Sequence, residues 1–467
     1  MRRSPRFDLA AVFVLSLFLS PHAFCRTWDV LVDGTGDTPT IQAGIDSAAA
    51  GDTVLVHDGI FTGPGNRGLV FGGKAIVLRS VSGPEETVID CEGSGRGIFI
   101  DGEGYEPTVE GLTIRGGSAY GGGGILVEAR AVIRNCRIVE NSSNTNGGGI
   151  CSWDAFVRIE DCLVRDNTAA QEGGGICVWM GRGEIRRSIL ASNTGGGGGG
   201  ICCYGVSGSI DLDSCLVSGN LATYGGGGIA GGGDEGVHLE FRHTTVTGNR
   251  AFVEGGGIHG GEYYDVPHRG RRSIVWGNCA PSAAEIYAEP WPGFVLEFSD
   301  VDTSDFTGWS GVCLIESICE DPLFCDPADC SNAPTVSGDY SLDAASPCLP
   351  AQTGGYPIGV YEQGCDFATG VAEGNDRPGG LSRLRAFPNP FTGEVSLRYS
   401  LPEIARRPIL VYDIRGRVVR TLEASGPAGV STWDGEDESG RAVPPGAYFV
   451  RIGSGPGEEI RRIMRIR

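Results

Sequence analysis

The stretch GGGGILV at residues 121–127 contains a motif, three glycines followed by isoleucine, that occurs six times between residues 119 and 258. The isoleucines lie 25, 26, 25, 28 and 29 residues apart and are Ile125, Ile150, Ile176, Ile201, Ile229 and Ile258. A repeat this short cannot enclose a hydrophobic core alone. Successive copies are therefore expected to stack as the coils of a solenoid.

An asparagine stands eight or nine residues before each isoleucine from Ile150 onward, and one more closes the series. Gly116 takes this place in the first copy. The asparagines are Asn141, Asn167, Asn193, Asn220, Asn249 and Asn278. The segments before them, such as CRIVEN at 136–141, alternate polar and apolar residues as half-buried strands do. We expect a ladder of asparagines inside one corner, in which each side-chain amide bonds to the neighbouring coils.

The repeat contains two short strand-like runs and no helical periodicity. It predicts an all-β protein whose main part is a right-handed parallel β-helix solenoid, with equivalent residues stacked about 4.8 Å apart. The isoleucines should point inward together with Val127 and Val178. Cys136, Cys162 and Cys215 are expected at small core positions, and the glycines at a corner that needs positive φ.

The chain divides into segments of different composition. We assign residues 1–25 to a secretory signal peptide, 26–110 to an N-terminal cap and first coils, 111–298 to the β-helix repeats, 299–366 to a cysteine-rich C-terminal cap, 367–380 to a linker and 381–467 to a small antiparallel immunoglobulin-like β-sandwich. In the first cap, a short helix with Thr38 as N-cap is expected to cover the open end of the solenoid. No other apolar run is long enough to span a bilayer, so we expect export to the medium or the cell surface without a transmembrane anchor.

The formal net charge of −21 over 467 residues argues against nucleic acid as a partner, which requires a basic face. It is compatible with Ca²⁺, although no cofactor or metal site is predicted.

Export also permits disulfides among the sixteen cysteines. Cys151, Cys177 and Cys202 each follow a ladder isoleucine, which would stack them at a spacing that a disulfide bridges, with the pairing left open. A second group is expected to staple a loop-rich cap and comprises Cys313, Cys319, Cys325, Cys330, Cys348 and Cys365.

The GGGI and V-x-x-N ladders, with DPLFCDPADC (321–330), DYSLDAASPC (339–348) and PIGVYEQG (357–364), resemble right-handed β-helix proteins of the pectate-lyase-like superfamily. They are most similar to the secreted branch called choice-of-anchor Q or polymorphic-outer-membrane-like. The resemblance covers about residues 27–366. It implies the fold and assigns no activity.

The C-terminal segment carries Asn389-Pro390-Phe391, YDIRGR at 412–417, Trp433-Asp434-Gly435 and PGAY at 445–448. These motifs resemble the immunoglobulin-like domain shared by flagellar hook-cap proteins and type IX secretion sorting tails. The resemblance implies a sorting or surface-attachment role with the export machinery as partner. A solubilising accessory domain fits the same residues, because fold does not settle function.

One outward column carries large aromatic residues. Glu128, Trp153, Trp179 and Tyr204 each lie three residues past a ladder isoleucine, so they are expected on the surface opposite the core, stacked on successive coils. We predict that this column binds an extended polysaccharide or a cell-surface component. The alternative is an aromatic ladder covered by a loop.

The alternative function is a polysaccharide lyase or glycoside hydrolase acting on acidic polysaccharide, which needs acid and base groups that converge from adjacent coils. The candidate acids are Asp154, Glu160, Asp161, Asp166, Asp211 and Asp213, and no second coil repeats a matching set. The candidates for a general-base or metal site are His259, Glu262, Asp265 and His268, with His238 and His243 one coil earlier. Catalytic residues stay unassigned, and we favour non-catalytic recognition or adhesion.

Overall fold

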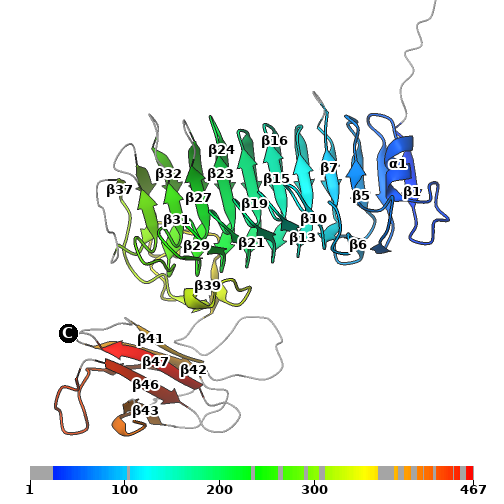
Figure 1. Cartoon of the computed structure of the whole chain (residues 1–467). Coiled ribbons are helices and arrows are strands. Elements are labelled where there is room, and N and C mark those ends of the chain that lie inside the picture. The colour runs from blue at the N-terminus through cyan, green and yellow to red at the C-terminus, as the bar shows by residue number, and fades with distance from the viewer. Residues whose placement is uncertain are drawn as a thin grey trace, which may run out of the picture.

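The computed structural model describes residues 25–465 except 103–105, 233–236, 261–266, 289–292, 304–310, 366–382, 388–393, 401–407, 414, 424–427, 445 and 453–458. The predicted signal peptide and linker therefore lie outside the described residues. Within the described part, parallel strands wind into a long β-helix (Figure 1). The all-β class and the right-handed β-helix followed by a small antiparallel sandwich are confirmed.

Between residues 108 and 260 each coil has four strands, and the expectation of two strands per repeat was wrong. The chain visits four parallel sheets in turn, which we call sheets I to IV. Sheet I contains β4 (Leu69–Val70), β7 (Ile98–Ile100), β11 (Ile125–Val127), β15 (Ile150–Trp153), β19 (Ile176–Trp179), β23 (Ile201–Tyr204), β27 (Ile229–Gly232), β31 (Ile258–Gly260) and β34 (Ile286–Ala288). Sheet II contains β1 (Thr27–Val30), β2 (Thr53–Val56), β5 (Val77–Ser80), β8 (Thr108–Glu110), β12 (Ala131–Arg134), β16 (Phe156–Glu160), β20 (Arg182–Arg186), β24 (Ser209–Asp213), β28 (His238–Arg242), β32 (His268–Arg271), β35 (Phe294–Glu297) and β37 (Val312–Ile315).

The other two sheets have shorter strands. Sheet III contains β3 (Gly59–Phe61), β6 (Thr87–Asp90), β9 (Thr113–Arg115), β13 (Arg137–Val139), β17 (Leu163–Arg165), β21 (Ile189–Ala191), β25 (Leu216–Ser218), β29 (Thr245–Thr247), β33 (Ile274–Trp276) and β36 (Asp300–Val301). Sheet IV contains β10 (Ser118–Ala119), β14 (Ser142–Ser143), β18 (Thr168–Ala169), β22 (Thr194–Gly195), β26 (Leu221–Ala222) and β30 (Arg250–Ala251). The coils thus continue past residue 298, through β36 and β37.

Corners made by single left-handed residues explain the extra strands. In the coil of Ile150, three aspartates with positive φ separate the strands: Asp154 (48°), Asp161 (54°) and Asp166 (57°). Asp tolerates this region because its short polar side chain bonds locally. A corner of one residue leaves no turn signature, so neighbouring strands such as β16 and β17 read as one run. The glycine corner does adopt positive φ at the first glycine of each triplet, for example 61° at Gly147.

The core is a set of stacked apolar columns. All six repeat isoleucines are fully buried and pair in register, for example Ile150 with Ile176. Val127, Val178 and the three cysteines Cys136, Cys162 and Cys215 are buried in the same cluster.

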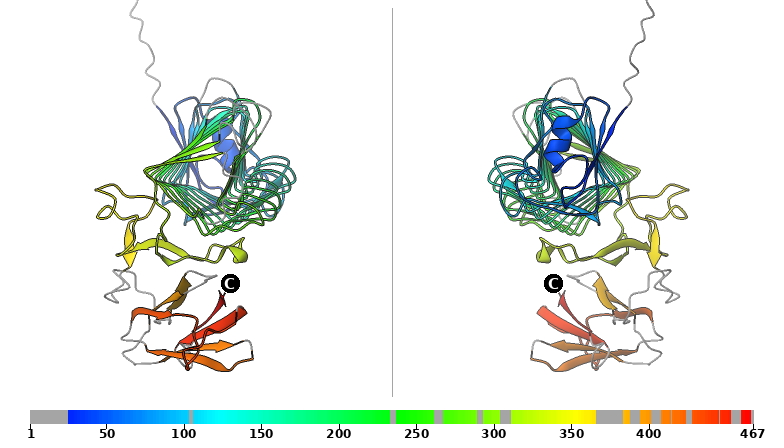
Figure 2. Two further views of the ribbon diagram at one scale, coloured as in Figure 1. Left: turned by 90° about the vertical axis from the view of Figure 1, so that its left-hand side faces the viewer. Right: turned by 90° about the vertical axis from the view of Figure 1, so that its right-hand side faces the viewer.

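Helix α1 (Ile41–Ser47) packs Ile41 and Ile45 over the first strands and covers that end of the β-helix (Figure 2). Its N-cap is Thr40, whose Oγ1 accepts from Ala43 N at 3.2 Å. The expectation of Thr38 was therefore wrong.

The asparagines form one continuous row of hydrogen bonds between sheets III and IV. In each coil, the Oδ1 of one asparagine accepts both the backbone N–H and the side-chain Nδ2–H of the asparagine one coil earlier. Asn193 Oδ1 accepts from Asn167 N and Nδ2, each at 3.0 Å, while Asn193 Nδ2 donates to Val164 O at 3.0 Å. In the first copy, the residue aligned with Asn141 is Gly117, whose N–H donates to Asn141 Oδ1, and not Gly116.

The ladder ends in a buried carboxyl group. Asn278 N and Nδ2 donate to Glu285 Oε1 at 3.0 Å and Oε2 at 2.6 Å. Glu285 stands at the position of the third glycine of the motif. In the preceding coil this glycine is Gly257, which packs against Asn278, the next asparagine of the ladder. Its carboxyl thus accepts the two N–H groups that a further asparagine would accept. Burial raises the pKa of Glu285 to about 8, and the Asn278 bonds oppose this rise.

Residues 316–365, which we call the strap, lie along the side of the β-helix against sheet III (Figures 1 and 2) and not across its end. The strap contains β38 (Phe324–Asp326), the short 3₁₀ helix η1 (Cys330–Asn332), β39 (Asp339–Asp343) and β40 (Gln363–Cys365). Phe324, Tyr340 and Leu342 cover the outward residues Leu216 and Ile274. Two disulfides hold the strap: Cys279–Cys330 and Cys325–Cys365. The first joins it to the coil directly after the last asparagine.

The C-terminal domain is a sandwich of two antiparallel sheets. One contains β41 (Arg383–Phe387), β42 (Val395–Ser400) and β45 (Ala428–Trp433), and the other contains β44 (Val418–Glu423), β43 (Pro408–Asp413), β46 (Gly446–Ile452) and β47 (Glu459–Arg465). Trp433 is fully buried between them, and its indole N–H donates to Glu436 O at 2.8 Å. This domain has a hydrophobic core separate from that of the β-helix.

We predict that Asn193→Ala lowers the free energy of unfolding by about 3 kcal/mol, because it leaves several buried donors and acceptors without partners. Asn144→Ala, at an exposed loop position, is the matched control and should change it by less than about 0.5 kcal/mol. Urea unfolding measures both. Equal effects of the two substitutions would contradict the role of the ladder.

We predict that Glu285→Gln changes how stability depends on pH. The folded pKa of about 8 lies above the ordinary value of 4.5. Between these values the folded chain holds a proton that the unfolded chain releases, so the wild type should lose roughly 1 kcal/mol per pH unit as pH rises. Unfolding at pH 5 and pH 8 should show the full loss in the wild type and in the exposed-site control Glu86→Gln. The loss should be smaller in Glu285→Gln, where buried Asp300, whose pKa is raised to about 7, still contributes to it. If the free energy of unfolding of all three proteins depended on pH in the same way, this role of Glu285 would be excluded.

Candidate recognition surface

The outward column of sheet I carries the predicted aromatic row. Trp153 and Trp179 stack with ring centroids 5.4 Å apart and an interplanar angle of 10°, and Trp179 stacks on Tyr204 at 5.1 Å and 27°. In-register pairing of β15, β19 and β23 produces this contact. Trp153 is 41 % exposed and Tyr204 36 %. Glu128, which directly follows β11, is exposed at the same position one coil earlier.

Ring stacking determines which parts of the row a ligand can reach. Because the rings lie nearly parallel, each covers a face of its neighbour, and both faces of Trp179 are occupied. The row therefore presents ring edges to solvent along its length. Exposed Met180 and Val206, in the turns that follow Trp179 and Tyr204, widen it into an apolar patch. Patches of aromatic and aliphatic side chains on a soluble protein are typical of binding surfaces.

The column next to the row, one residue past each isoleucine, contains the three predicted thiols. Cys151, Cys177 and Cys202 are buried and pair in register, yet none is in a disulfide. In-register parallel strands hold Cβ atoms at the coil spacing of about 4.8 Å, which exceeds the roughly 3.5–4.5 Å that a disulfide needs. The neighbouring Cys177 thiol and burial hold the pKa of Cys151 well above its ordinary value. These thiols act as small apolar residues.

Most of the candidate acids pair with basic side chains. Along one column the charges alternate from coil to coil, from Arg134 through Glu160 to Arg186. Asp161 accepts two hydrogen bonds from Arg187 at 2.8 Å, and this contact lowers the pKa of Asp161. The remaining ion pairs are Asp166 with Arg165, Asp211 with Arg182, and Asp213 with His243. Paired, solvated acids of this kind do not form the acid and base set that glycosidic chemistry requires.

Within the described residues, the candidate histidines do not form a metal-binding group with carboxylates, and Glu262 and Asp265 lie outside these residues. His268 is buried and its Nδ1 accepts from Leu239 N at 3.1 Å, and burial lowers the pKa of His268 to about 4. His259 instead contacts Glu254, with Nε2 and Oε1 3.2 Å apart. Sequence reasoning missed Glu254. A signal existed, since Glu172 and Glu254 both directly precede a glycine triplet.

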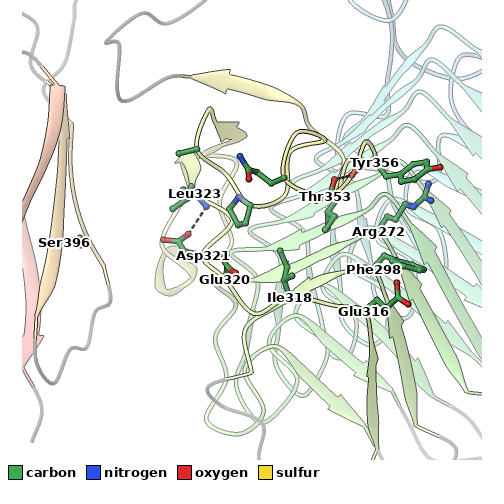
Figure 3. A pocket seen from close by; sticks show the side chains of 14 residues that line it. Arg272, Phe298, Glu316, Ile318, Glu320, Asp321, Leu323, Thr353, Tyr356 and Ser396 are labelled. Carbon is green, nitrogen blue, oxygen red and sulfur yellow. Dashed lines mark hydrogen bonds between the residues drawn. The ribbon is translucent and has the colours of Figure 1, made fainter.

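A cavity of about 810 Å³ lies beside the strap (Figure 3). Among the described residues that line it, the one cation is Arg272, whose guanidinium sits over the ring of Tyr356 at 4.1 Å. Glu316, Glu320 and Asp321 also line it. The Arg272 stacking joins the strap to the coils, so we read the cavity as a feature of their packing.

One group of three possible metal ligands occurs in the described part of the chain: Cys279, Asp329 and Cys330. Both sulfurs belong to one disulfide, which leaves the carboxylate of Asp329 as the remaining donor.

None of the described helices has the length and apolar character needed to cross a membrane.

Two family models match the chain. Residues 96–265 match the right-handed β-helix region, and residues 389–456 match the FlgD immunoglobulin-like domain. Each covers less than half of the chain. No curated protein matches.

Solved structures similar to this chain include the pectate lyase Pel9A, with 10 % identity, a TM-score of 0.44, and coverage of 72 % of this chain and 96 % of that one. The Dettilon tailspike protein has 11 % identity, a TM-score of 0.34, and coverage of 90 % and 78 %. A mannuronic acid specific family 6 polysaccharide lyase from human gut microbiota has 12 % identity, a TM-score of 0.27, and coverage of 63 % and 92 %. Similarity this distant gives no information on activity.

We predict that the two tryptophans of the row are energetically coupled. A double-mutant cycle with Trp153→Ala and Trp179→Ala should give a coupling of about 1 kcal/mol in the free energy of unfolding, as expected for stacked rings. The control pair is Trp153 and Trp276, which lies on sheet III. The effects of substituting these two residues on the free energy of unfolding should be additive. Additivity in both pairs would contradict the stacked geometry.

Proposed function

We propose that this protein recognises an extended polysaccharide on the outward surface of sheet I and performs no chemistry on it. The observation that supports the proposal best is the exposed aromatic row of Trp153, Trp179 and Tyr204. It is straight and repeats at the coil spacing, so an extended polymer running along the β-helix can contact each ring edge in turn. The pairing of most candidate acids with basic side chains supports the absence of catalysis.

The proposal includes export and attachment. We propose that residues 1–25 direct the chain out of the cytoplasm, and that the C-terminal domain serves as a sorting or surface-attachment module for the export machinery. The two disulfides of the strap agree with an oxidising compartment. The matched FlgD-type domain supplies the fold for such a module. The choice-of-anchor Q branch stays our proposed placement within the superfamily.

Retention on immobilised polysaccharides tests the recognition role. We predict that the Trp153→Ala/Trp179→Ala variant loses at least tenfold in affinity for the polymer that the wild type retains, a loss of about 1.4 kcal/mol or more. The control is Phe298→Ala/Tyr356→Ala, which removes two exposed aromatic side chains at the strap cavity and should bind normally. Unchanged retention by the tryptophan variant would remove the proposal.

A second assay addresses catalysis. The protein is incubated with polyuronates, with and without Ca²⁺, and unsaturated product is followed by its ultraviolet absorbance. We expect none. Product formation would establish the lyase alternative.

A further inference from the structure

A cluster of polar and aromatic side chains continues the surface of sheet I beyond the aromatic row. Glu254 Oε1 lies 3.2 Å from His259 Nε2, and their side chains are 18 % and 16 % exposed. The His259 ring stacks on Tyr287 at 4.9 Å and lies 6.1 Å from the ring of Tyr224, a residue that is 56 % exposed. The four residues come from three successive coils.

Small residues in the preceding coil make room for this cluster. Gly225 allows the His259 ring to pack against the loop, since a Cβ there would lie 2.7 Å from His259 Cδ2. Ala230 occupies the position of the thiols in the column that leads to His259. Gly232 occupies the position of the aromatic row, and a Cβ on it would lie 2.9 Å from Tyr204 Cε2. The row therefore leans toward the cluster, and one ligand chain can reach both.

The charge of this surface selects among polysaccharides. Its described carboxylates are Asp101, Glu128, Glu172 and Glu254. Arg96, a cation at the edge of this surface, donates to the backbone carbonyls of Tyr120, Gly121 and Gly122. With a net charge of −21 on the whole chain, an anionic polymer is repelled and a cationic one attracted.

We propose that Glu254, His259 and Tyr224 form a subsite for the amine of an amino sugar within the polysaccharide. The proposal rests on the function proposed above and names the class of its ligand. His259 Nε2–H donates to Glu254 Oε1 and fixes the carboxylate, whose Oε2 accepts from the ligand ammonium. The exposed ring of Tyr224 supplies an aromatic face beside the same ammonium group. No bond is made or broken.

Two oligosaccharides that differ only at nitrogen test this subsite in the full-length protein. The probes are a β-1,4-linked glucosamine hexamer and its fully N-acetylated counterpart, which carries no positive charge. The wild type should bind the amine form about tenfold more tightly at low salt, and added salt should reduce this preference. Glu254→Gln should abolish the preference while leaving binding of the acetylated hexamer unchanged. Glu140→Gln, which removes an exposed acid elsewhere, should retain it.

Tyr224→Leu provides a second variant, because replacing a side chain at a largely exposed position leaves the fold intact. It should reduce the preference for the amine at least threefold. If the wild type binds both hexamers and neither variant changes their ratio, the subsite is overturned and the proposed function stands. If the wild type retains other polysaccharides through its tryptophans but favours neither hexamer, the amine assignment fails alone. If the wild type binds no glycan at all, both the subsite and the proposed function are overturned.

Discussion

The buried amide of one asparagine per coil is the interaction on which this structure depends. Its Oδ1 accepts two N–H groups from the asparagine before it, and its Nδ2 donates to a core-strand carbonyl and to the next asparagine. Buried polar groups are costly unless paired, so the chain must place an equivalent asparagine in each following coil. A shift of one residue would break every bond in the row. Within the coils that it spans, the ladder therefore fixes the register of all four sheets.

Once the register is fixed, the outward residues of each sheet line up in columns along the coils. Sheet II carries alternating charges that neutralise one another across coils. Sheet III carries apolar residues, among them Leu216 and Ile274, and the disulfide-linked strap covers them. Sheet I carries the stacked aromatic row. No segment of the described chain covers this row as fully as the strap covers the apolar residues of sheet III. The remaining exposed apolar surface is what directs the functional proposal to sheet I.

The sequence was sufficient to predict the features in which one residue type recurs at a fixed spacing. The isoleucine core, the asparagine row and the line of Trp153, Trp179 and Tyr204 all follow from the repeat length. Features that depend on a single residue could not be predicted. One-residue corners such as Asp161 concealed two strands per coil, and a loop shorter by one residue moved the first ladder position from Gly116 to Gly117. Cys330 pairs with Cys279, outside the predicted cysteine group, because the strap folds back along sheet III. The contact between Glu254 and His259 depends on loop conformation, which no spacing rule describes.

Distances between spin labels on one column of sheet II test the stacking most directly. Residues 79, 134, 186 and 242 occupy the same column, each two coils after the one before. Labels are introduced as an unnatural amino acid, because the chain already contains sixteen cysteines. The account predicts that measured separations grow linearly with the number of coils, to about 19 Å for four coils and about 29 Å for six. Separations that do not scale with the number of coils would contradict it.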